Sequence, residues 1–327
     1  MKAIVALLTL VSATTTVLGF TYKNDPTWST FKTRFLKRYE TVDEEIRRYK
    51  IFLENMQLAS HYNDIDKEAV YGMTQFSDKL PSELFFETSD FGDDNSGSEI
   101  EPAPEVEGLG GNVPESYDWR TRGGVTGIKN QRQCGSCWAF AAVGCAEGAY
   151  FVKTKNLISL SEQELVDCDS TNKGCNGGQA KKALEWAKKK GGFMNETSYP
   201  YTAVKGTCVF DSSKALVKIK NVYSVSSKKP AKMQDAIVMY GPLAVSLDAA
   251  KFNSYISGIM DGSGCSSSSH NHAVLVVGWG VDATTSTKYW IIKNSWGSYW
   301  GESGYVRLVR GSNACAVEKN PFAAVAA

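Results

Sequence analysis

The run from Cys137 to Val152 constrains the fold of this chain more than any other segment. Its residues are apolar nearly all round a helix, and a helix of that kind is expected to be buried on every side. The sequence Gln131-Arg-Gln-Cys-Gly-Ser-Cys-Trp-Ala-Phe140 leads into it, so a thiol, Cys137, falls where the helix begins. Free N–H groups and partial positive charge at a helix N-terminus favour thiolate over thiol. The segment therefore predicts a nucleophile at the edge of a core.

The first residues of the chain indicate the route that the protein takes. Residues 1–19 run from Lys2 through an apolar stretch to small residues, which is typical of a secretory signal peptide; a buried N-terminal helix is the alternative. No later run is long and uncharged enough for a transmembrane helix. The chain has eight cysteines, and secreted chains with this many usually form disulfides. We therefore expect a protein of the secretory pathway, delivered to an acidic compartment such as a lysosome or vacuole or released outside the cell, with no membrane partner.

The formal net charge of +1 hides two parts of opposite sign. Through Asn112 the chain has 11 basic and 19 acidic residues, net −8, and the remainder has 25 basic and 16 acidic residues, net +9. Opposite charges of this size predict two parts that attract each other. A nucleic-acid partner is not indicated, because the lysines are scattered without interleaved aromatic residues.

Periodicity divides the chain into a helical front, a linker and two lobes. Hydrophobic residues recur every three or four positions from Pro26 to His61, which predicts helices in a region of about 26–88. Residues 89–111 are rich in Gly, Ser, Pro and acidic residues, and predict a protease-accessible linker. Beyond Cys137, Ser161-x-x-Glu164 has the form of a capping box for a second helix. Short runs rich in β-branched or aromatic residues predict strands at 216–225, 243–247, 273–279, 289–293 and 305–309. The pattern predicts an α+β fold with a helical lobe, a sheet or barrel lobe and a cleft between them.

A thiol such as Cys137 needs a base within hydrogen-bond reach and a third group to orient that base. The chain has three histidines, and His61 lies in the acidic part. His272 opens an apolar run and would be held at the mouth of a rigid strand, whereas His270 follows a serine-rich loop. His272 is therefore the predicted base.

Further residues complete the predicted site. Asn294 ends a predicted strand, and its amide oxygen can accept the second N–H of the histidine ring; Trp296 can shield that bond from water. Gln131 precedes the nucleophile, where a side-chain amide can join the backbone N–H of Cys137 in donating to an oxyanion, although a plain surface glutamine is the alternative. The set predicts nucleophilic attack on a carbonyl group.

Three segments, residues 131–140, Asn271-His272-Ala273 and Asn294-Ser295-Trp296-Gly297, closely resemble the active-site segments of the papain family of cysteine peptidases. The resemblance implies a papain-like two-lobe fold and an endopeptidase that needs no cofactor. It assigns Cys137 as nucleophile, His272 as base, Asn294 as its orienter and Gln131 as an oxyanion donor. It also implies a monomer that cleaves proteins and peptides and is inhibited by cystatin-type proteins.

The resemblance implies roles for residues that no local pattern assigns. Gly178, in the loop from Gly174 to Gly178, would bind the substrate backbone, although a plain turn is the alternative. The other substrate-binding residues would be Gln179, Ala180, Ser246, His270, Ala273 and Trp296. The implied disulfides are Cys134–Cys175, Cys168–Cys208 and Cys265–Cys315, a pairing that spacing alone cannot derive. Cys137 then stays free, and Cys145 is an additional thiol within the apolar helix. Asn195 begins a glycosylation sequon, Asn195-Glu-Thr197.

The chain before residue 113 resembles the propeptide of cathepsin L-like zymogens. The helical signature of these propeptides has the spacing of Glu44, Arg48, Phe52, Asn55 and Asn63, with Ala59 in place of the usual isoleucine. A second motif matches Gly72, Phe76 and Asp78, with Thr74 where asparagine is common. The implied division is a signal peptide at 1–19, a propeptide at 20–112 and a mature peptidase at 113–327. Our hypothesis is that the acidic propeptide covers the enzyme at neutral pH, and that protonation of its carboxylates loosens it in an acidic compartment.

Three alternatives compete with the peptidase on local grounds. Cys134-Gly-Ser-Cys137 has the layout of a dithiol oxidoreductase, although no βαβ pattern leads into it. His270-x-His272 could begin a zinc site, but no third ligand with metal-like spacing follows, so no metal is expected. A binding module derived from a peptidase would have lost its nucleophile, and Cys137 is present.

Overall fold

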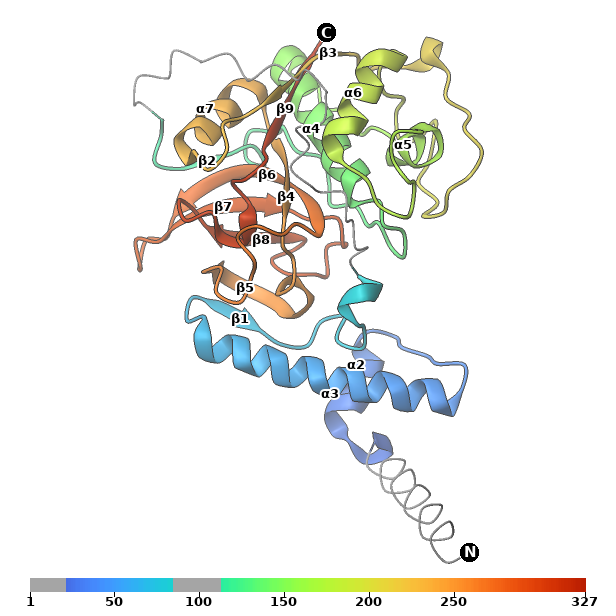
Figure 1. Cartoon of the computed structure of the whole chain (residues 1–327), viewed down its shortest axis with the longest axis vertical. Helices are drawn as coiled ribbons and strands as arrows, with labels where there is room; N and C mark the ends of the chain where they lie inside the picture. Colours follow the sequence, from blue (N-terminus) through green and yellow to red (C-terminus); the bar gives the residue numbers. More distant parts are fainter. Residues whose placement is uncertain (1–21, 85–112) are drawn as a thin grey trace, which may run out of the picture.

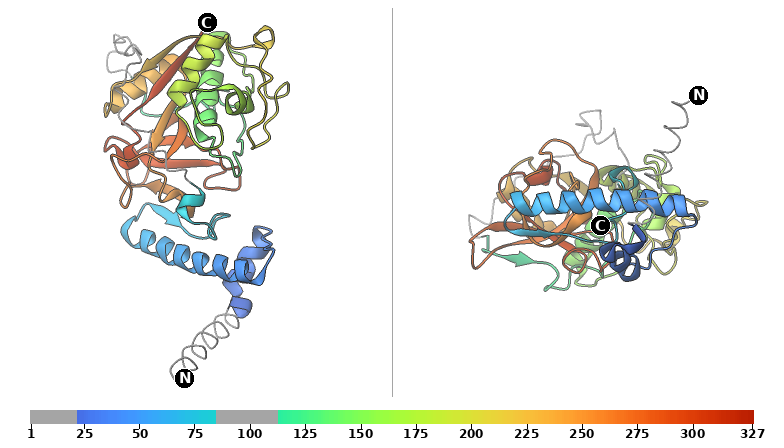
Figure 2. Two further views of the ribbon diagram at one scale, coloured as in Figure 1. Left: turned by 45° about the vertical axis from the view of Figure 1, so that its right-hand side comes forward. Right: turned by 90° about the horizontal axis from the view of Figure 1, so that it is seen from below.

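The computed structural model describes residues 22–84 and 113–327. The predicted signal peptide (1–19) and acidic linker (89–111) lie outside the described residues. Figure 1 shows helices α4, α5 and α6 gathered on one side of the C-terminal part, with strands β5–β8 on the other. Residues 22–84, here called the front segment, lie across the end of the strand-rich side, as the left view in Figure 2 also shows.

The front segment is built on two helices, α2 (Pro26–Arg34) and α3 (Val42–Ile65). The carboxylate of Asp25 accepts hydrogen bonds from the first turn of α2, and the Thr41 hydroxyl accepts one from the first turn of α3, so both helices have the N-cap that their free N–H groups require. The helical spacing from Pro26 to His61 is thus divided between two helices. A strand, β1 (Ala69–Tyr71), and a 3-10 helix, η1 (Pro81–Glu83), follow. The helices bury an aromatic core of Tyr22, Trp28, Phe31, Tyr49 and Phe52.

Helix α4 (Cys137–Thr154) is the buried helix that its sequence predicts. It packs against α5 (Glu162–Cys168) and α6 (Ala180–Lys190) on one side and against strands of the sheet on the other. Ser161 caps α5 as predicted, because its hydroxyl accepts the N–H of Glu164 at 3.0 Å. The Glu164 carboxylate, however, accepts the N–H of Met194 rather than reaching back to the cap, so the box is only half formed.

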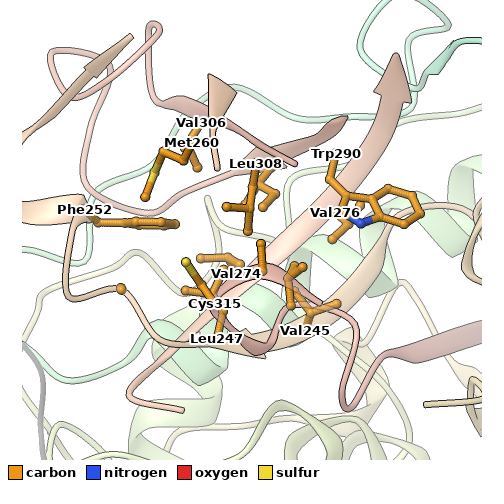
Figure 3. Packing of buried hydrophobic residues seen from close by; sticks show 14 of the residues in the cluster. Val245, Leu247, Phe252, Met260, Val274, Val276, Trp290, Val306, Leu308 and Cys315 are labelled. Carbon is orange, nitrogen blue, oxygen red and sulfur yellow. The ribbon is translucent and has the colours of Figure 1, made fainter. Parts of the chain in front are cut away.

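A sheet forms the other lobe, in the order β1-β5-β8-β7-β6-β4-β9-β3, with β2 paired to β6. The strands of the C-terminal part are β2 (Tyr117–Asp118), β3 (Ile219–Ser224), β4 (Leu243–Leu247), β5 (Tyr255–Met260), β6 (His272–Val281), β7 (Lys288–Lys293), β8 (Tyr305–Val309) and β9 (Phe322–Ala326). They are connected through α7 (Pro230–Tyr240) and the 3-10 helices η2 (Ser212–Lys214), η3 (Phe252–Ser254) and η4 (Ala314–Ala316). Figure 3 shows side chains of these strands packed together, among them Val245, Val274, Trp290 and Leu308.

Strand β1 makes the front segment part of this sheet. It pairs with β5 in antiparallel orientation, with Ala69 opposite Gly258 and Tyr71 opposite Tyr255. The N–H of Ile259 donates to the carbonyl of Glu68, and the N–H of Gly72 to that of Ser254, both at 2.8 Å. Because β1 is the terminal strand, β5 is the edge of the sheet that the C-terminal part forms by itself.

Candidate active site

The predicted nucleophile and base meet where the two lobes touch. Cys137 is the first residue of α4, and His272 is the first residue of β6. The Cys137 sulfur accepts a hydrogen bond from the backbone N–H of Ala273, the residue after His272. Both residues are buried, with 9% of the surface of Cys137 and 1% of that of His272 exposed. A thiol and an imidazole from opposite lobes thus converge on one point.

The register of β6 and β7 places Asn294, the predicted orienting residue, beside His272. Leu275 lies opposite Lys293, the last residue of β7, so Asn294 reaches back toward the start of β6. His272 Nε2 and Asn294 Oδ1 are 2.8 Å apart. Because an amide oxygen can only accept, Nε2 carries the proton of this bond.

Aromatic rings screen this hydrogen bond from water. The ring of Trp296 lies 4.9 Å from that of His272, and the ring of Phe252 lies 6.4 Å from it, both measured between centroids. Both rings are buried. In such surroundings a hydrogen bond is electrostatically stronger than in water.

Gln131 is held in place by Ser295. The Gln131 N–H donates to the Ser295 carbonyl at 2.8 Å, and the Ser295 hydroxyl donates to Gln131 Oε1 at 2.6 Å. Fixing the oxygen directs the amide nitrogen toward the loop before Cys137, where Nε2 donates to the Cys134 carbonyl at 3.1 Å. Sequence reasoning gave Ser295 no role of its own, because its role depends on a contact between segments 164 residues apart.

The comparison with known protein families decides what this arrangement belongs to. Residues 113–325 match the papain family cysteine protease domain. The chain belongs to the papain family. Residues 28–84 match the cathepsin propeptide inhibitor domain, so the front segment is the inhibitory propeptide of this papain-family protease.

Relatives cover nearly the whole chain. A probable cysteine protease of Arabidopsis thaliana, RD19D, is 41% identical over 304 residues, which are 88% of this chain and 82% of the relative. Digestive procathepsin L 3 of Tenebrio molitor matches with a TM-score of 0.79 at 35% identity, over 91% of this chain and 98% of that one. The recombinant stem bromelain precursor matches with a TM-score of 0.80 at 33% identity, over 91% of this chain and 97% of that one. The predicted α+β two-lobe fold, the cathepsin L-like zymogen and the cysteine endopeptidase activity are confirmed.

In this papain-family zymogen, burial favours the neutral forms of both the thiol and the imidazole. Burial raises the pKa of the Cys137 thiol to about 11, against backbone hydrogen bonds that favour the thiolate. Burial also lowers the pKa of His272 to about 4, against the hydrogen bond that His272 donates to Asn294. The helix N-terminus predicted a thiolate near neutral pH, but here desolvation outweighs that effect.

The front segment packs on the site from the Trp296 side. Gln75 Nε2 donates to the Trp296 carbonyl at 2.9 Å, and the ring of Phe76 meets that of Trp296 edge-on at 5.0 Å between centroids. A cavity of about 300 Å³ remains between these residues and Gln131 and Arg132. Phe76, which belongs to the second propeptide motif, therefore contacts the tryptophan that screens the hydrogen bond between His272 and Asn294.

Three predicted substrate-binding residues lie at the start of α6. Gly178 precedes the helix, and a Cβ there would lie 2.6 Å from Asn172 Oδ1 and 2.8 Å from the Trp138 ring, so packing alone requires glycine. Gln179 is the N-cap residue, and its N–H donates to Asn172 Oδ1 at 2.8 Å. Ala180, the first helical residue, is buried.

The other predicted substrate-binding residues lie on the strand side. Ser246 and Ala273 are opposite each other on β4 and β6. His270 is buried, with 8% of its surface exposed, although its sequence context predicted an open serine-rich loop. The sequon residue Asn195 accepts hydrogen bonds from Thr197 and from the N–H of Ser198 at its side-chain oxygen.

The cysteines pair as the resemblance implied, with disulfides Cys134–Cys175, Cys168–Cys208 and Cys265–Cys315. Cys137 and Cys145 are free and buried. Because Cys134 is bonded to Cys175, it is not the partner thiol that an oxidoreductase built on Cys134 and Cys137 would need.

The described residues contain neither a metal cluster nor a membrane-spanning helix. Over residues 22–84 and 113–327, no three His, Cys, Asp or Glu side chains are grouped so as to hold a metal ion. Over the same ranges, every helix is too short or too polar to cross a bilayer.

A buried charge cluster lies behind the site, and no sequence pattern indicated it. Lys129 Nζ lies 3.1 Å from Glu147 Oε1 on α4. The Thr126 hydroxyl donates to Glu147 at 2.6 Å and accepts from Lys293 Nζ at 2.9 Å. Although burial favours the neutral amine, Glu147 raises the pKa of Lys129. The cluster joins α4 to the end of β7, next to Asn294.

Proposed function

We propose that Cys137, His272, Asn294 and Gln131 carry out the peptide-bond hydrolysis of this cysteine endopeptidase. The observation that supports this most is the convergence of thiol, imidazole and amide where the lobes meet. Asn294 Oδ1 lies 2.8 Å from His272 Nε2, and the Cys137 sulfur accepts a hydrogen bond from the N–H of Ala273. A nucleophile, a base and an orienting group in this order form a catalytic triad.

The steps follow from the positions of these groups. Once the front segment leaves, water re-enters the cleft and the Cys137 proton moves to His272 Nδ1. The thiolate attacks the substrate carbonyl carbon, and the oxyanion accepts hydrogen bonds from the Cys137 N–H and from Gln131 Nε2. His272 protonates the leaving amine, and an acyl-enzyme forms. His272 then takes a proton from water, and the resulting hydroxide adds to the acyl carbon. The carbon–sulfur bond breaks, the acid product leaves, and the Cys137 thiolate and protonated His272 are restored.

The substrate is proposed to lie across the start of α6 and of β6. The backbone of Gly178 binds the substrate backbone, while Trp296 flanks the catalytic pair. The side chain just upstream of the scissile residue enters a pocket lined by Gln179, Ala180, Ser246, His270 and Ala273. Gln179 and His270 make this pocket more polar than an all-aliphatic one, which weakens any preference for hydrophobic side chains.

Maturation is proposed to separate residues 20–112 from a monomeric enzyme of residues 113–327, after removal of the signal peptide 1–19. The charge of −8 through Asn112 and +9 beyond it supports a complex of the two parts that is held partly by electrostatics. The enzyme is expected in an acidic lysosome- or vacuole-like compartment or outside the cell, with cystatin-type proteins as inhibitors.

The proposed roles are tested by titrating the processed enzyme with a thiol-directed epoxide peptide and mapping the labelled residue. We expect one label per active enzyme, on Cys137, with complete loss of hydrolysis of a short fluorogenic peptide. The variant Cys137→Ala should bind the substrate and hydrolyse none of it. Label on Cys145, or hydrolysis that survives labelling of Cys137, would show that the nucleophile is misassigned.

A further inference from the structure

A lysine of the protease domain is fully buried, with its ammonium group against the front segment. Lys251, just before η3, has no exposed side-chain surface, and neither does its partner Asp66 at the end of α3; Lys251 Nζ and Asp66 Oδ2 are 3.0 Å apart. The ammonium group also lies 5.2 Å from the ring centroid of Tyr62 and 4.6 Å from that of Tyr71. All three of these neighbours belong to the front segment, so its departure uncovers Lys251.

The carboxylate of Asp66 is held by both parts of the chain. Its Oδ2 accepts a hydrogen bond from the Tyr71 hydroxyl at 2.6 Å and from the backbone N–H of Asp261 at 3.2 Å. The N–H of Asp261 and the ammonium of Lys251 belong to the protease domain and remain there after maturation. Together they form a site that can bind a carboxylate. Among the described residues of the protease domain, the one carboxylate beside the ammonium group is that of Asp261, 3.7 Å from Lys251 Nζ.

A strand edge lies next to this carboxylate site. Within the protease domain, β5 pairs with β8 on one side only, through Ile259 and Met260. Its other side holds β1, and Gly258 lets the two backbones approach, since a Cβ there would lie 2.2 Å from the Glu68 carbonyl. Without β1, the backbone groups of β5 are unpaired, and such an edge is a template for an added strand.

We propose that release of the front segment turns Lys251 and the edge of β5 into a second peptide-binding site, which captures extended acidic segments of protein substrates by strand addition. This proposal rests on the proposed maturation, in which residues 20–112 separate from the enzyme. The segment that fits has a carboxylate side chain three residues before the strand, the spacing of Asp66 to Ala69, and an aromatic residue five positions after the carboxylate, as Tyr71 is. The net charge of +9 on residues 113–327 favours the approach of such segments.

This site is separate from the catalytic cleft. The front-segment residues that contact Trp296, beside the catalytic pair, are Gln75 and Phe76, which follow β1 in the chain. A peptide that ends at Met73 therefore contains the strand and the carboxylate but not the cleft contacts. Occupation of the second site should lower the KM for proteins with a fitting segment and leave short peptides unaffected.

The test uses a fluorescent peptide of residues 64–73, from Asp64 to Met73, and mature enzyme whose Cys137 is blocked by the epoxide. We expect the peptide to bind, and Asp66→Asn in the peptide to weaken binding at least about tenfold on the unaltered enzyme. Lys251→Met in the enzyme should cause the same loss. Asp261→Asn should tighten binding, because it removes the competing carboxylate. Lys220→Met, on the opposite edge strand β3, removes the same charge and should change nothing.

Equal affinity for the peptide and its Asp66→Asn form would overturn the proposal. So would competition between the peptide and a short fluorogenic substrate of the unblocked enzyme, because binding would then lie in the cleft. The proposed catalytic function is read separately, from hydrolysis of that short substrate by the same mature enzyme before the epoxide is added. Its loss with intact peptide binding refutes the catalytic assignment and leaves the second site standing.

Discussion

Burial decides the chemistry of single residues in this zymogen. Cys137 stands at a helix N-terminus, which favours the thiolate, yet burial raises the pKa of its thiol to about 11. In the proposed mechanism the same thiol must become anionic to attack a carbonyl. We therefore expect removal of the front segment to act on the charge state of Cys137 as well as on access to the cleft.

Alkylation of Cys137 should report this change directly. Because the thiolate is the reacting form, the zymogen should react at least about a hundredfold more slowly than the mature enzyme at pH 6, and its rate should rise about tenfold per pH unit up to pH 9. The rate of the mature enzyme should vary little over that range. Peptide mapping after iodoacetamide treatment measures both rates. Cys145, whose pKa burial also raises to about 11, serves as the internal control and should stay unmodified in both forms.

Asn294 is expected to act through His272 rather than on the substrate. The variant Asn294→Ala should lower kcat/KM by about 10–100-fold, which is a smaller loss than removal of the base His272 would cause. Because the hydrogen bond to Asn294 raises the pKa of His272 against burial, its loss should also move the basic limb of the pH–rate profile to lower pH. An unchanged profile with reduced rate would indicate a merely structural role for Asn294.

At the scale of elements, α4 joins the nucleophile to the sheet. A Cβ at Gly148 would lie 2.4 Å from the Pro242 ring just before β4, and one at Gly144 would lie 2.8 Å from Leu275 on β6. These short distances set the position of the helix relative to the strand that begins with His272. The catalytic geometry therefore depends on two glycines far from the reacting atoms.

The substitution Gly148→Ala should destabilise the mature enzyme by about 1–3 kcal/mol, because the added methyl group forces α4 away from Pro242. The unfolding temperature measures this effect. Gly127→Ala is the matched control, because no atom lies within 4 Å of a Cβ built there and the φ angle of Gly127 is not positive. Its unfolding temperature should therefore stay unchanged. A stable Gly148→Ala enzyme would show that the helix can shift freely.

At the scale of the whole molecule, the front segment is bound as an extra strand as well as a cleft contact. The acidic trigger expected from the sequence depends on the carboxylates at this interface. Although burial opposes ionisation of Asp66, hydrogen bonds from Tyr71 and Lys251 lower its pKa below the usual 3.8. A lowered pKa in the bound state means that this contact is complete above the free value and is lost as the pH falls through the bound value. We therefore expect protonation of Asp66 to weaken docking of the front segment only below about pH 4.

Neutralising Asp66 should loosen the zymogen at neutral pH. The variant Asp66→Asn leaves Lys251 buried beside a neutral amide, which should weaken docking by about 3 kcal/mol, or roughly a hundredfold. The measurement is hydrolysis of a short peptide by the uncleaved zymogen at pH 7. The control is Asp64→Asn, which removes an exposed carboxylate from the same helix and should leave the activity as low as in the unaltered zymogen. Equal activity of the two variants would mean that net charge alone matters.

A buried carboxyl in the helical lobe should set the stability of the mature enzyme at high pH. Burial raises the pKa of Glu164 to about 8, against the hydrogen bond from the Met194 N–H. A raised pKa in the folded state contributes stability that is complete below the unfolded value and is lost as the pH rises toward 8, by a few kcal/mol in total. Glu164→Gln should flatten this decline between pH 5 and 8 in thermal unfolding curves; a parallel decline in both proteins would assign it to another group.

The sequence by itself predicted the candidate catalytic residues and determined much of the fold, because these depend on local patterns. The strands 243–247 and 305–309 have the bounds that their β-branched and aromatic residues predict. Sequence reasoning did not single out β5, with Gly258 in its middle, or the lysine-rich α6. A residue in a short mixed segment takes its conformation from the partner it pairs with, which lies elsewhere in the chain.

Only the tertiary structure decided which distant groups meet. Asp66 and Lys251 are 185 residues apart, and their contact requires the register of β1 on β5, which no local pattern fixes. The pKa values of Cys137 and His272 likewise depend on burial, a property of the folded chain as a whole. Residue types and spacing thus determine what chemistry is available, while the packing of one part on another determines which charges exist and when they are exposed.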